Sequence, residues 1–178
     1  MERHESVPII LAKFFSERRD VNPYASAAMM RSLDQVMRNQ LANSLALAAA
    51  QWRQLYQEQG RALHTPSRAQ GLPDADALNQ LRHLKAQADA LSTLTAHIHA
   101  LGAPASDRVY HRLRNNETLL TQLIDLDRQL AENATAFDQI LPQLTLESWP
   151  VLEADFHTHL EGITQGLRLR AQLLTDIV

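Results

Sequence analysis

The 178-residue sequence contains no cysteine, and this absence excludes several kinds of chemistry at once. Disulfide frameworks, thiolate nucleophiles, cysteine-type zinc sites and iron–sulfur clusters all need a thiolate. The apolar run near the N-terminus is too short, and is interrupted too soon by charge, to be a secretion signal. No window approaches the 18 apolar residues of a membrane span. We therefore expect a cytoplasmic protein that does not enter a membrane.

Glycine is also scarce, and the common catalytic patterns are missing. Five glycines cannot form a dinucleotide-binding fingerprint, and there is neither a phosphate-loop pattern nor a serine in a Gly-x-Ser-x-Gly turn. A di-iron bundle needs two Glu-x-x-His pairs, and the sequence has none. We expect a protein that is not an enzyme and holds neither a metal nor another cofactor. A metal-dependent bundle enzyme remains a less favoured alternative.

Positive charge is not abundant enough to predict a nucleic-acid surface. Residues 1–70 carry nine Lys and Arg against six Asp and Glu, whereas residues 71–178 carry eight against fourteen. Affinity for phosphates grows with the number of phosphates neutralised, and neither half is strongly basic. We expect weak or no direct binding to nucleic acid. The expected partners are other proteins, bound through helix faces.

Proline and glycine divide the chain into helical segments, and no period-2 run of β-branched residues predicts a sheet. A short helix is expected over residues 8–15. The expected long helices are residues 22–59, with Asn22 as N-cap and Pro23 in the first turn, residues 73–101, residues 106–141, and the chain after Pro150.

Each long segment carries one narrow apolar stripe with steps of three and four residues, so the helices can bury these stripes only against one another. The short connections after the second and third segments predict antiparallel neighbours, and residues 60–73 make a longer connection that can be mobile. We expect one all-α domain over residues 1–178, an elongated antiparallel up-down four-helix bundle of coiled-coil type. Residues 1–22 would be an N-terminal appendage. A spectrin-like three-helix coil with an appendage is the competing geometry.

Three polar residues interrupt the stripes of the third and fourth segments. They are Asn116, Asp127 and Arg170, and we interpret them as a structural polar seam that fixes helix register. If these two segments turn near residue 146, Asp127 and Arg170 come within reach of each other. We therefore predict an Asp127–Arg170 pair, the alternative being that Arg170 reaches outward into solvent.

Other polar and aromatic residues have ordinary structural interpretations. Glu153, His157 and Glu161 share a helix face, as do Asp155 and His159, and a solvated face explains them better than a metal site does. For Trp52 and Tyr56 we favour core packing over stacking on a nucleic-acid base. Gly162 and Gly166 indicate close helix packing, or a weak spot in the fourth segment.

Short matches in all four segments point to one family. They are Leu33, Asp34 and Met37; His83, Leu84, Ala86, Gln87, Ala90 and Leu91; Glu117, Leu120, Leu123 and Ile124; and Leu152, Glu153, Ala154, Phe156 and Leu160. In this order and near this spacing, the chain resembles the primosomal protein C family, also called primosomal replication protein N″. The resemblance implies a helical replication-restart factor that contacts single-stranded-DNA-binding protein and helps to load the replicative helicase.

The chain departs from that family where the family is more basic. Leu119 and Leu120 replace an Arg-rich pair, and residues 159–163 replace a basic element nearer the C-terminus. The remaining candidates for partner binding are Arg108, Arg112, Arg114, Arg168 and Arg170. We expect the first three to lie well apart from the last two. The alternative function is a helical scaffold, a chaperone or a small-ligand sensor unrelated to replication.

Overall fold

The computed structural model describes residues 24–63, 74–101 and 107–175, and every regular element in these ranges is helical. The expected all-α class is therefore confirmed for this part of the chain. The elements are α2 (Ala27–Leu63), α3 (Ala75–Ala100), α4 (Asp107–Arg114), α5 (Glu117–Ile140), the short 3₁₀ helix η1 (Leu141–Gln143) and α6 (Trp149–Thr175). The short helix expected over residues 8–15, and the N-terminal appendage as a whole, lie outside the described residues.

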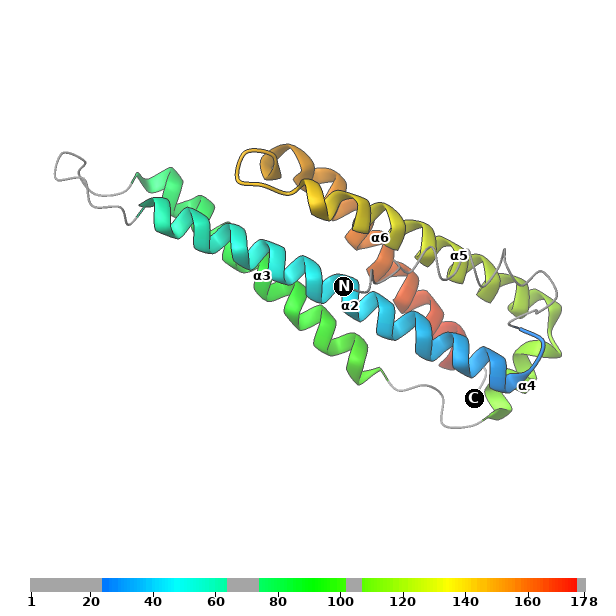
Figure 1. Cartoon of the computed structure of the whole chain (residues 1–178). Helices are drawn as coiled ribbons and strands as arrows, with labels where there is room; N and C mark the ends of the chain where they lie inside the picture. Colours follow the sequence, from blue (N-terminus) through cyan, green and yellow to red (C-terminus); the bar gives the residue numbers. More distant parts are fainter. Residues whose placement is uncertain (1–23, 64–73, 102–106, 176–178) are drawn as a thin grey trace, which may run out of the picture.

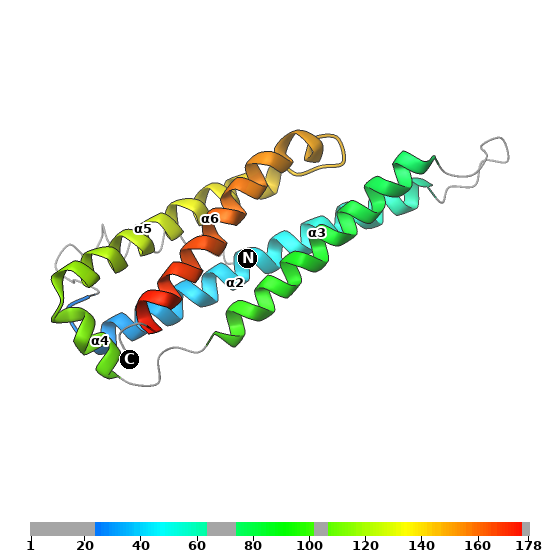
Figure 2. The same ribbon diagram turned by 180° about the vertical axis from the view of Figure 1, so that it is seen from behind.

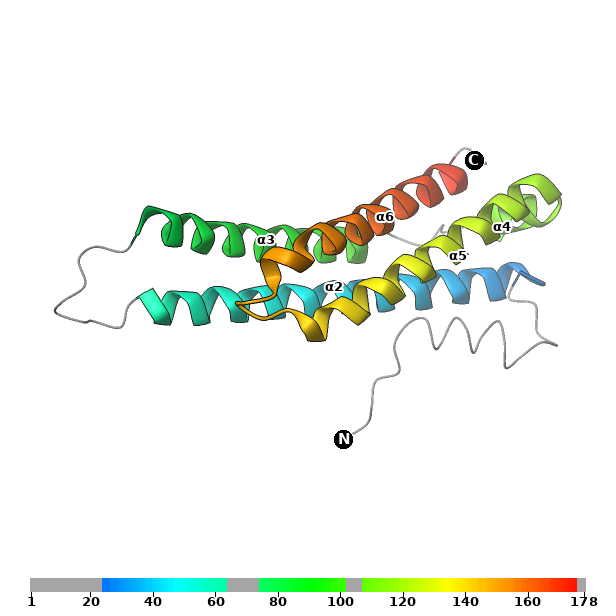
Figure 3. The same ribbon diagram turned by 90° about the horizontal axis from the view of Figure 1, so that it is seen from above.

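The long helices form two hairpins, α2 with α3 and α5 with α6 (Figure 1). The two helices of each hairpin run in opposite directions, and the α2–α3 hairpin extends beyond the end of the other (Figure 2). Seen from above, the α5–α6 hairpin crosses α2 and α3 obliquely (Figure 3). The core lies between the hairpins and is lined mainly by the apolar stripe of α2.

Contacts between the two hairpins show which of their helices lie beside each other. Ser44 of α2 donates to Asp138 of α5 (3.2 Å), and Gln51, two turns further along α2, donates to the carbonyl of Leu144 after η1 (3.0 Å). On the other side, His83 of α3 pairs with Glu153 of α6. α2 therefore runs beside α5, and α3 beside α6. This differs from the expectation that the second and third segments are direct neighbours.

The third segment is two helices rather than one, because the chain breaks at Asn115 and Asn116. Asn116 is the N-cap of α5, and its side-chain oxygen accepts a hydrogen bond from the backbone N–H of Leu119 (3.1 Å). Asparagine favours caps over helix interiors, and Glu117 in the first turn suits the positive end of the helix dipole. Asn116 is exposed, so its assignment to the buried polar seam is wrong.

The boundaries of α2 also differ from the expectation. Residues 24–26 are not helical, and the serine at position 26 accepts a hydrogen bond from the N–H of Met29 (3.2 Å), so the helix starts four residues later than predicted. Asn22 and Pro23 lie outside the described residues. At the other end, α2 continues through Gly60 to Leu63, because one glycine costs a helix only about 1 kcal/mol. The connection predicted over residues 60–73 is therefore shorter than expected.

An aromatic cluster fills the core where the two hairpins cross. The ring of Trp52 meets Phe156 edge-on at 5.3 Å and Trp149 at 6.0 Å, and Phe137 packs on Phe156 at 4.8 Å. Trp52 is fully buried and Tyr56 half-buried, which confirms their predicted core role. These rings join α2, α5 and α6 into one apolar layer.

Two glycines let α5 and α6 approach closely, which confirms the close-packing interpretation. A Cβ atom at Gly166 would lie 2.7 Å from the buried side chain of Leu130, and one at Gly162 would lie 2.6 Å from Asn133. Neither glycine has a positive φ angle, so the space they leave, and not an unusual backbone, explains their use here.

Candidate functional site

A buried ion network connects three helices at the end of the molecule that holds α4. Arg170 of α6 donates from Nε to Oδ1 of Asp127 in α5 at 2.7 Å, so the pair predicted from the stripes is present. Its Nη1 also pairs with Asp34 of α2. Both carboxylates are 0% exposed and Arg170 is 6% exposed. Arg170 therefore crosses the core from α6 to two other helices at once.

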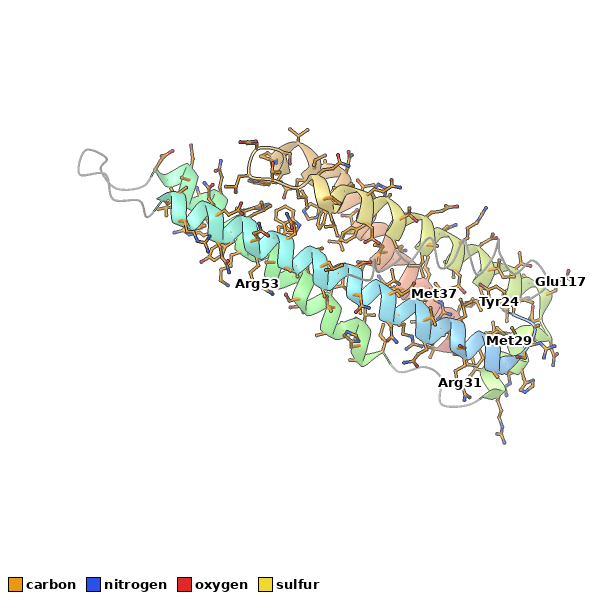
Figure 4. All side chains as sticks on the ribbon, in the orientation of Figure 1. Tyr24, Met29, Arg31, Met37, Arg53 and Glu117 are labelled. Carbon is orange, nitrogen blue, oxygen red and sulfur yellow. The ribbon has the colours of Figure 1, made fainter. Side chains whose placement is uncertain are left out.

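The network continues beyond these three residues. Arg38, one turn after Asp34 on α2, pairs with the second oxygen of Asp34 and donates to the carbonyl of Leu101, the residue that follows α3. At the other side, the Tyr24 hydroxyl donates to Oδ2 of Asp127 (2.8 Å). Tyr24 lies at the end of the molecule where α2 begins (Figure 4). An unbroken chain of polar contacts thus runs from the end of α3 to the start of α2.

The charges in this network balance, with two carboxylates against two guanidinium groups. Burial, and then the negative charge of Asp127, raise the pKa of Tyr24 above its ordinary value, so its hydroxyl stays protonated and donates. Burial, and then the neighbouring Arg170, lower the pKa of Arg38. Buried charges are tolerated only when paired, so each member depends on the others.

The sequence predicted two of the five side chains of this network, Asp127 and Arg170, and the other three, Asp34, Arg38 and Tyr24, were missed. Asp34 lies beside Leu33 within the apolar stripe of α2, and Arg38 follows it at the i, i+4 spacing that suits an ion pair on a helix. This spacing in the sequence could have predicted the Asp34–Arg38 pair. Tyr24 precedes the helix, and no local pattern connects it with a residue 103 positions away.

An apolar cavity of about 290 Å³ opens next to the network. Asp34, Arg38 and Arg170 form its polar wall, and the remaining wall is mainly apolar. The apolar lining is Met37, Leu41, Leu101, Val109, Leu130, Leu167, Ala171 and Leu174. A second cavity, of about 490 Å³, lies between α3 and α6 and shares Leu101, Leu167, Ala171 and Thr175 with the first. The two cavities adjoin along α6, and we call them together the cleft.

The candidate partner-binding arginines divide into two kinds. Arg108, Arg112 and Arg114 are exposed on α4, whose opposite face buries Val109, Tyr110 and Leu113. Arg168 is exposed and lines the second cavity. Arg170 is buried in the ion network, so its assignment as a surface docking cation is wrong.

The two arginine sets are closer than predicted. Val109 of α4 and Leu174 of α6 line the same cavity, which places α4 next to the last turns of α6. Figures 1 and 2 show α4 and the C-terminal end of α6 at the same end of the molecule. The expectation that the sets lie well apart is therefore wrong at the level of the helices, because the break at Asn116 turns α4 back across this end.

The Glu and His residues of α6 do not gather into a metal site. Glu153 pairs with His83 across the seam between α3 and α6, and with His157 on its own helix at 3.5 Å. His159 instead contacts Asn133 of α5 (3.3 Å). Within residues 24–63, 74–101 and 107–175, no group of three or more His, Asp or Glu side chains is placed to hold a metal ion.

The described helices offer no membrane span, and the comparisons with known proteins find no match. Among the helices described here, none combines the length and apolar character needed to cross a membrane. No protein-family model, curated protein or solved structure matches the chain.

Proposed function

We propose that this chain is a non-enzymatic helical adaptor of the replication-restart type, which contacts single-stranded-DNA-binding protein and helps to load the replicative helicase. The resemblance to the primosomal protein C family suggests this function. A cytoplasmic location and an up-down four-helix bundle in solution are parts of the same proposal. The observation that carries it is the apolar cleft beside the arginine-bearing helix α4.

The cleft and its surroundings suit an acidic protein tail that contains an apolar side chain. Leu101, Leu167 and Ala171 are partly exposed and offer apolar surface for such a side chain. Arg168 lies in the wall of the adjoining cavity, and the arginines of α4 are exposed at the same end of the molecule. Acidic residues beside the apolar one would then meet positive charge, which favours both association rate and orientation.

The ion network supports this site by holding its walls. Arg38 ties α2 to the end of α3, and Arg170 ties α6 to α2 and α5. All four of these elements contribute to the wall of the first cavity. A site with fixed walls loses less conformational entropy when a partner binds.

The test is binding of a fluorescent peptide that carries the acidic C-terminal tail of single-stranded-DNA-binding protein, measured by anisotropy. We expect the triple variant Arg108→Ser, Arg112→Ser and Arg114→Ser to weaken binding about tenfold, because it removes three charges near the cleft. Its matched control changes three exposed arginines elsewhere, Arg53→Ser, Arg82→Ser and Arg128→Ser, and should bind like the wild type.

A second variant tests the cavity itself, and a tail-less partner completes the experiment. Ala171→Phe places a ring in the space that both cavities share, and we expect it to abolish peptide binding without unfolding the chain. Full-length single-stranded-DNA-binding protein should bind, and the same protein without its tail should not. Equal binding by the arginine triple variant and its control would refute the proposed site. Equal recovery of the tailed and tail-less partner would refute the proposed function.

The cavity also favours one alternative, a sensor that holds a small ligand between its helices. Its size approaches that of ordinary ligand pockets, about 300–1,000 Å³. A thermal-shift screen distinguishes the two functions. A small molecule that raises the melting temperature of the wild type but not of Ala171→Phe would favour the sensor.

A further inference from the structure

A contact between a histidine and a carboxylate crosses the seam between α3 and α6, on the side where the cleft opens. Nε2 of His83, on α3, pairs with Oε1 of Glu153, on α6. The ring of His83 also stacks on Trp149, with ring centres 5.5 Å apart and planes at 23°. Trp149 and Glu153 are one turn apart on α6, so the imidazole lies against two side chains of the same helix face.

This contact and the cleft occupy the same seam. α3 and α6 run beside each other, and the second cavity is lined by Leu94 and His97 of α3 and by Leu167 and Arg168 of α6. The seam is therefore closed at the His83 end by polar and aromatic contacts and hollow at the other end. A change that loosens the closed end weakens the contact between α6 and α3 there.

We propose that His83 is a proton-dependent clasp, which closes the α3–α6 seam when protonated and loosens it when neutral. Protonation of the imidazole adds two favourable interactions in this position. The protonated ring forms a full ion pair with Glu153, and it gains a cation–π attraction to the face of Trp149. A neutral imidazole keeps at most one hydrogen bond to the carboxylate. Histidine is the side chain that changes charge between about pH 5 and 8.

Several other titratable and charged groups lie near His83. On α6, His157 also contacts Glu153 at 3.5 Å, but both are on the same helix, so their pairing cannot hold the seam. Glu147 is exposed in the turn before α6. On α3 itself, Arg82 and Lys85 flank His83 and are exposed, and Lys85 pairs with Asp89. On α2, Gly60 lies against Leu81, which brings Tyr56 and Glu58 to the level of His83.

His157 provides a closely matched control. Its side chain is 39% exposed and that of His83 is 40% exposed, and both contact the same carboxylate oxygen. The two histidines differ in that His83 reaches Glu153 from another helix. A pH effect that depends on His83 and not on His157 therefore reflects a change in the contact between α3 and α6.

The absence of cysteine makes the measurement direct, because introduced thiols are the only labelling sites. Spin labels at Ala90→Cys on α3 and Thr158→Cys on α6, both exposed positions, report the seam by pulsed electron paramagnetic resonance. Labels at Ala50→Cys and Ala90→Cys report the α2–α3 hairpin, which should not respond to pH. Samples are prepared from pH 5.5 to pH 8.5.

We expect the open, longer-distance population of the seam pair to rise about two- to five-fold between pH 5.5 and 8.5, the range typical of one exposed ion pair. His83→Gln should abolish the pH dependence, since glutamine keeps a hydrogen bond to Glu153 but cannot be protonated. His157→Gln should keep it. A wild-type seam that is independent of pH would overturn the proposal, as would an unchanged response in His83→Gln or a lost response in His157→Gln. None of these outcomes depends on the proposed partner.

Discussion

Replacing Arg170 by methionine should cost the fold a large share of its stability. Methionine keeps much of the apolar stem of arginine but is shorter and makes no bond to Asp127 or Asp34. Asp34 would keep Arg38, whereas Asp127 would keep the Tyr24 hydroxyl and lose its guanidinium partner. Both carboxylates are fully buried, so the loss of a charged partner is costly for Asp127.

The expected cost of Arg170→Met is about 3–5 kcal/mol, the range for breaking a buried ion pair by removing one partner. Stabilities of ordinary domains are about 5–15 kcal/mol, so the loss is easily measured. If the loss of stability comes from the Asp127 carboxylate left without its guanidinium partner, adding Asp127→Asn should restore about 1–3 kcal/mol of the free energy of unfolding. The amide removes the buried charge and keeps an oxygen for the Tyr24 hydroxyl.

Urea unfolding followed by circular dichroism and by tryptophan fluorescence gives both free energies. Arg168→Met, the same change two residues earlier at an exposed position, should stay within about 0.5 kcal/mol of wild type. An equally small effect of Arg170→Met and Arg168→Met would contradict the stabilising role of the buried ion pairs. So would a failure of Asp127→Asn to restore stability in the Arg170→Met background, because the cost would then come from lost packing.

Two further predictions concern the α5–α6 hairpin and its contact with α2. Gly166→Ala should lower stability by about 1 kcal/mol, because overpacking against the buried Leu130 costs about 1–3 kcal/mol and exceeds the roughly 1 kcal/mol gain in helix propensity. In Gly162→Ala the new methyl group lies against the half-exposed side-chain amide of Asn133, which can rotate away. The melting temperature of this variant should therefore equal or exceed that of the wild type. Burial raises the pKa of Asp138, against a smaller lowering by the Ser44 hydroxyl. Its charged form therefore costs stability at pH 7, and this cost vanishes as the pH falls below about 4, the ordinary carboxyl range. Asp138→Asn should be more stable than wild type at pH 7 and equal to it near pH 3.5 in urea unfolding, and an equal difference at both pH values would contradict this.

Some contacts of the candidate site can be predicted from the sequence pattern, and others cannot. The Asp127–Arg170 pair could be predicted because both residues interrupt apolar stripes of helices that a short turn joins. The same rule failed for Asn116, because asparagine interrupts a stripe equally well by ending a helix. Arg170 was also assigned to two roles, and burial decided between them, since an arginine held by two buried carboxylates is not available to a partner.

The sequence by itself determined the helices, their apolar faces and the absence of thiol chemistry, because helical periodicity and composition are local properties. Only the tertiary structure decided which helices are neighbours. The sites depend on that choice: Asp34 meets Arg170 across 136 residues, His83 meets Glu153 across 70, and the cleft exists because α3 lies beside α6. Such contacts depend on how two hairpins pack, and narrow leucine-rich stripes allow more than one packing. The physical reason is that apolar burial is non-directional, so the placement of a few charged side chains and two glycines selects one arrangement from several.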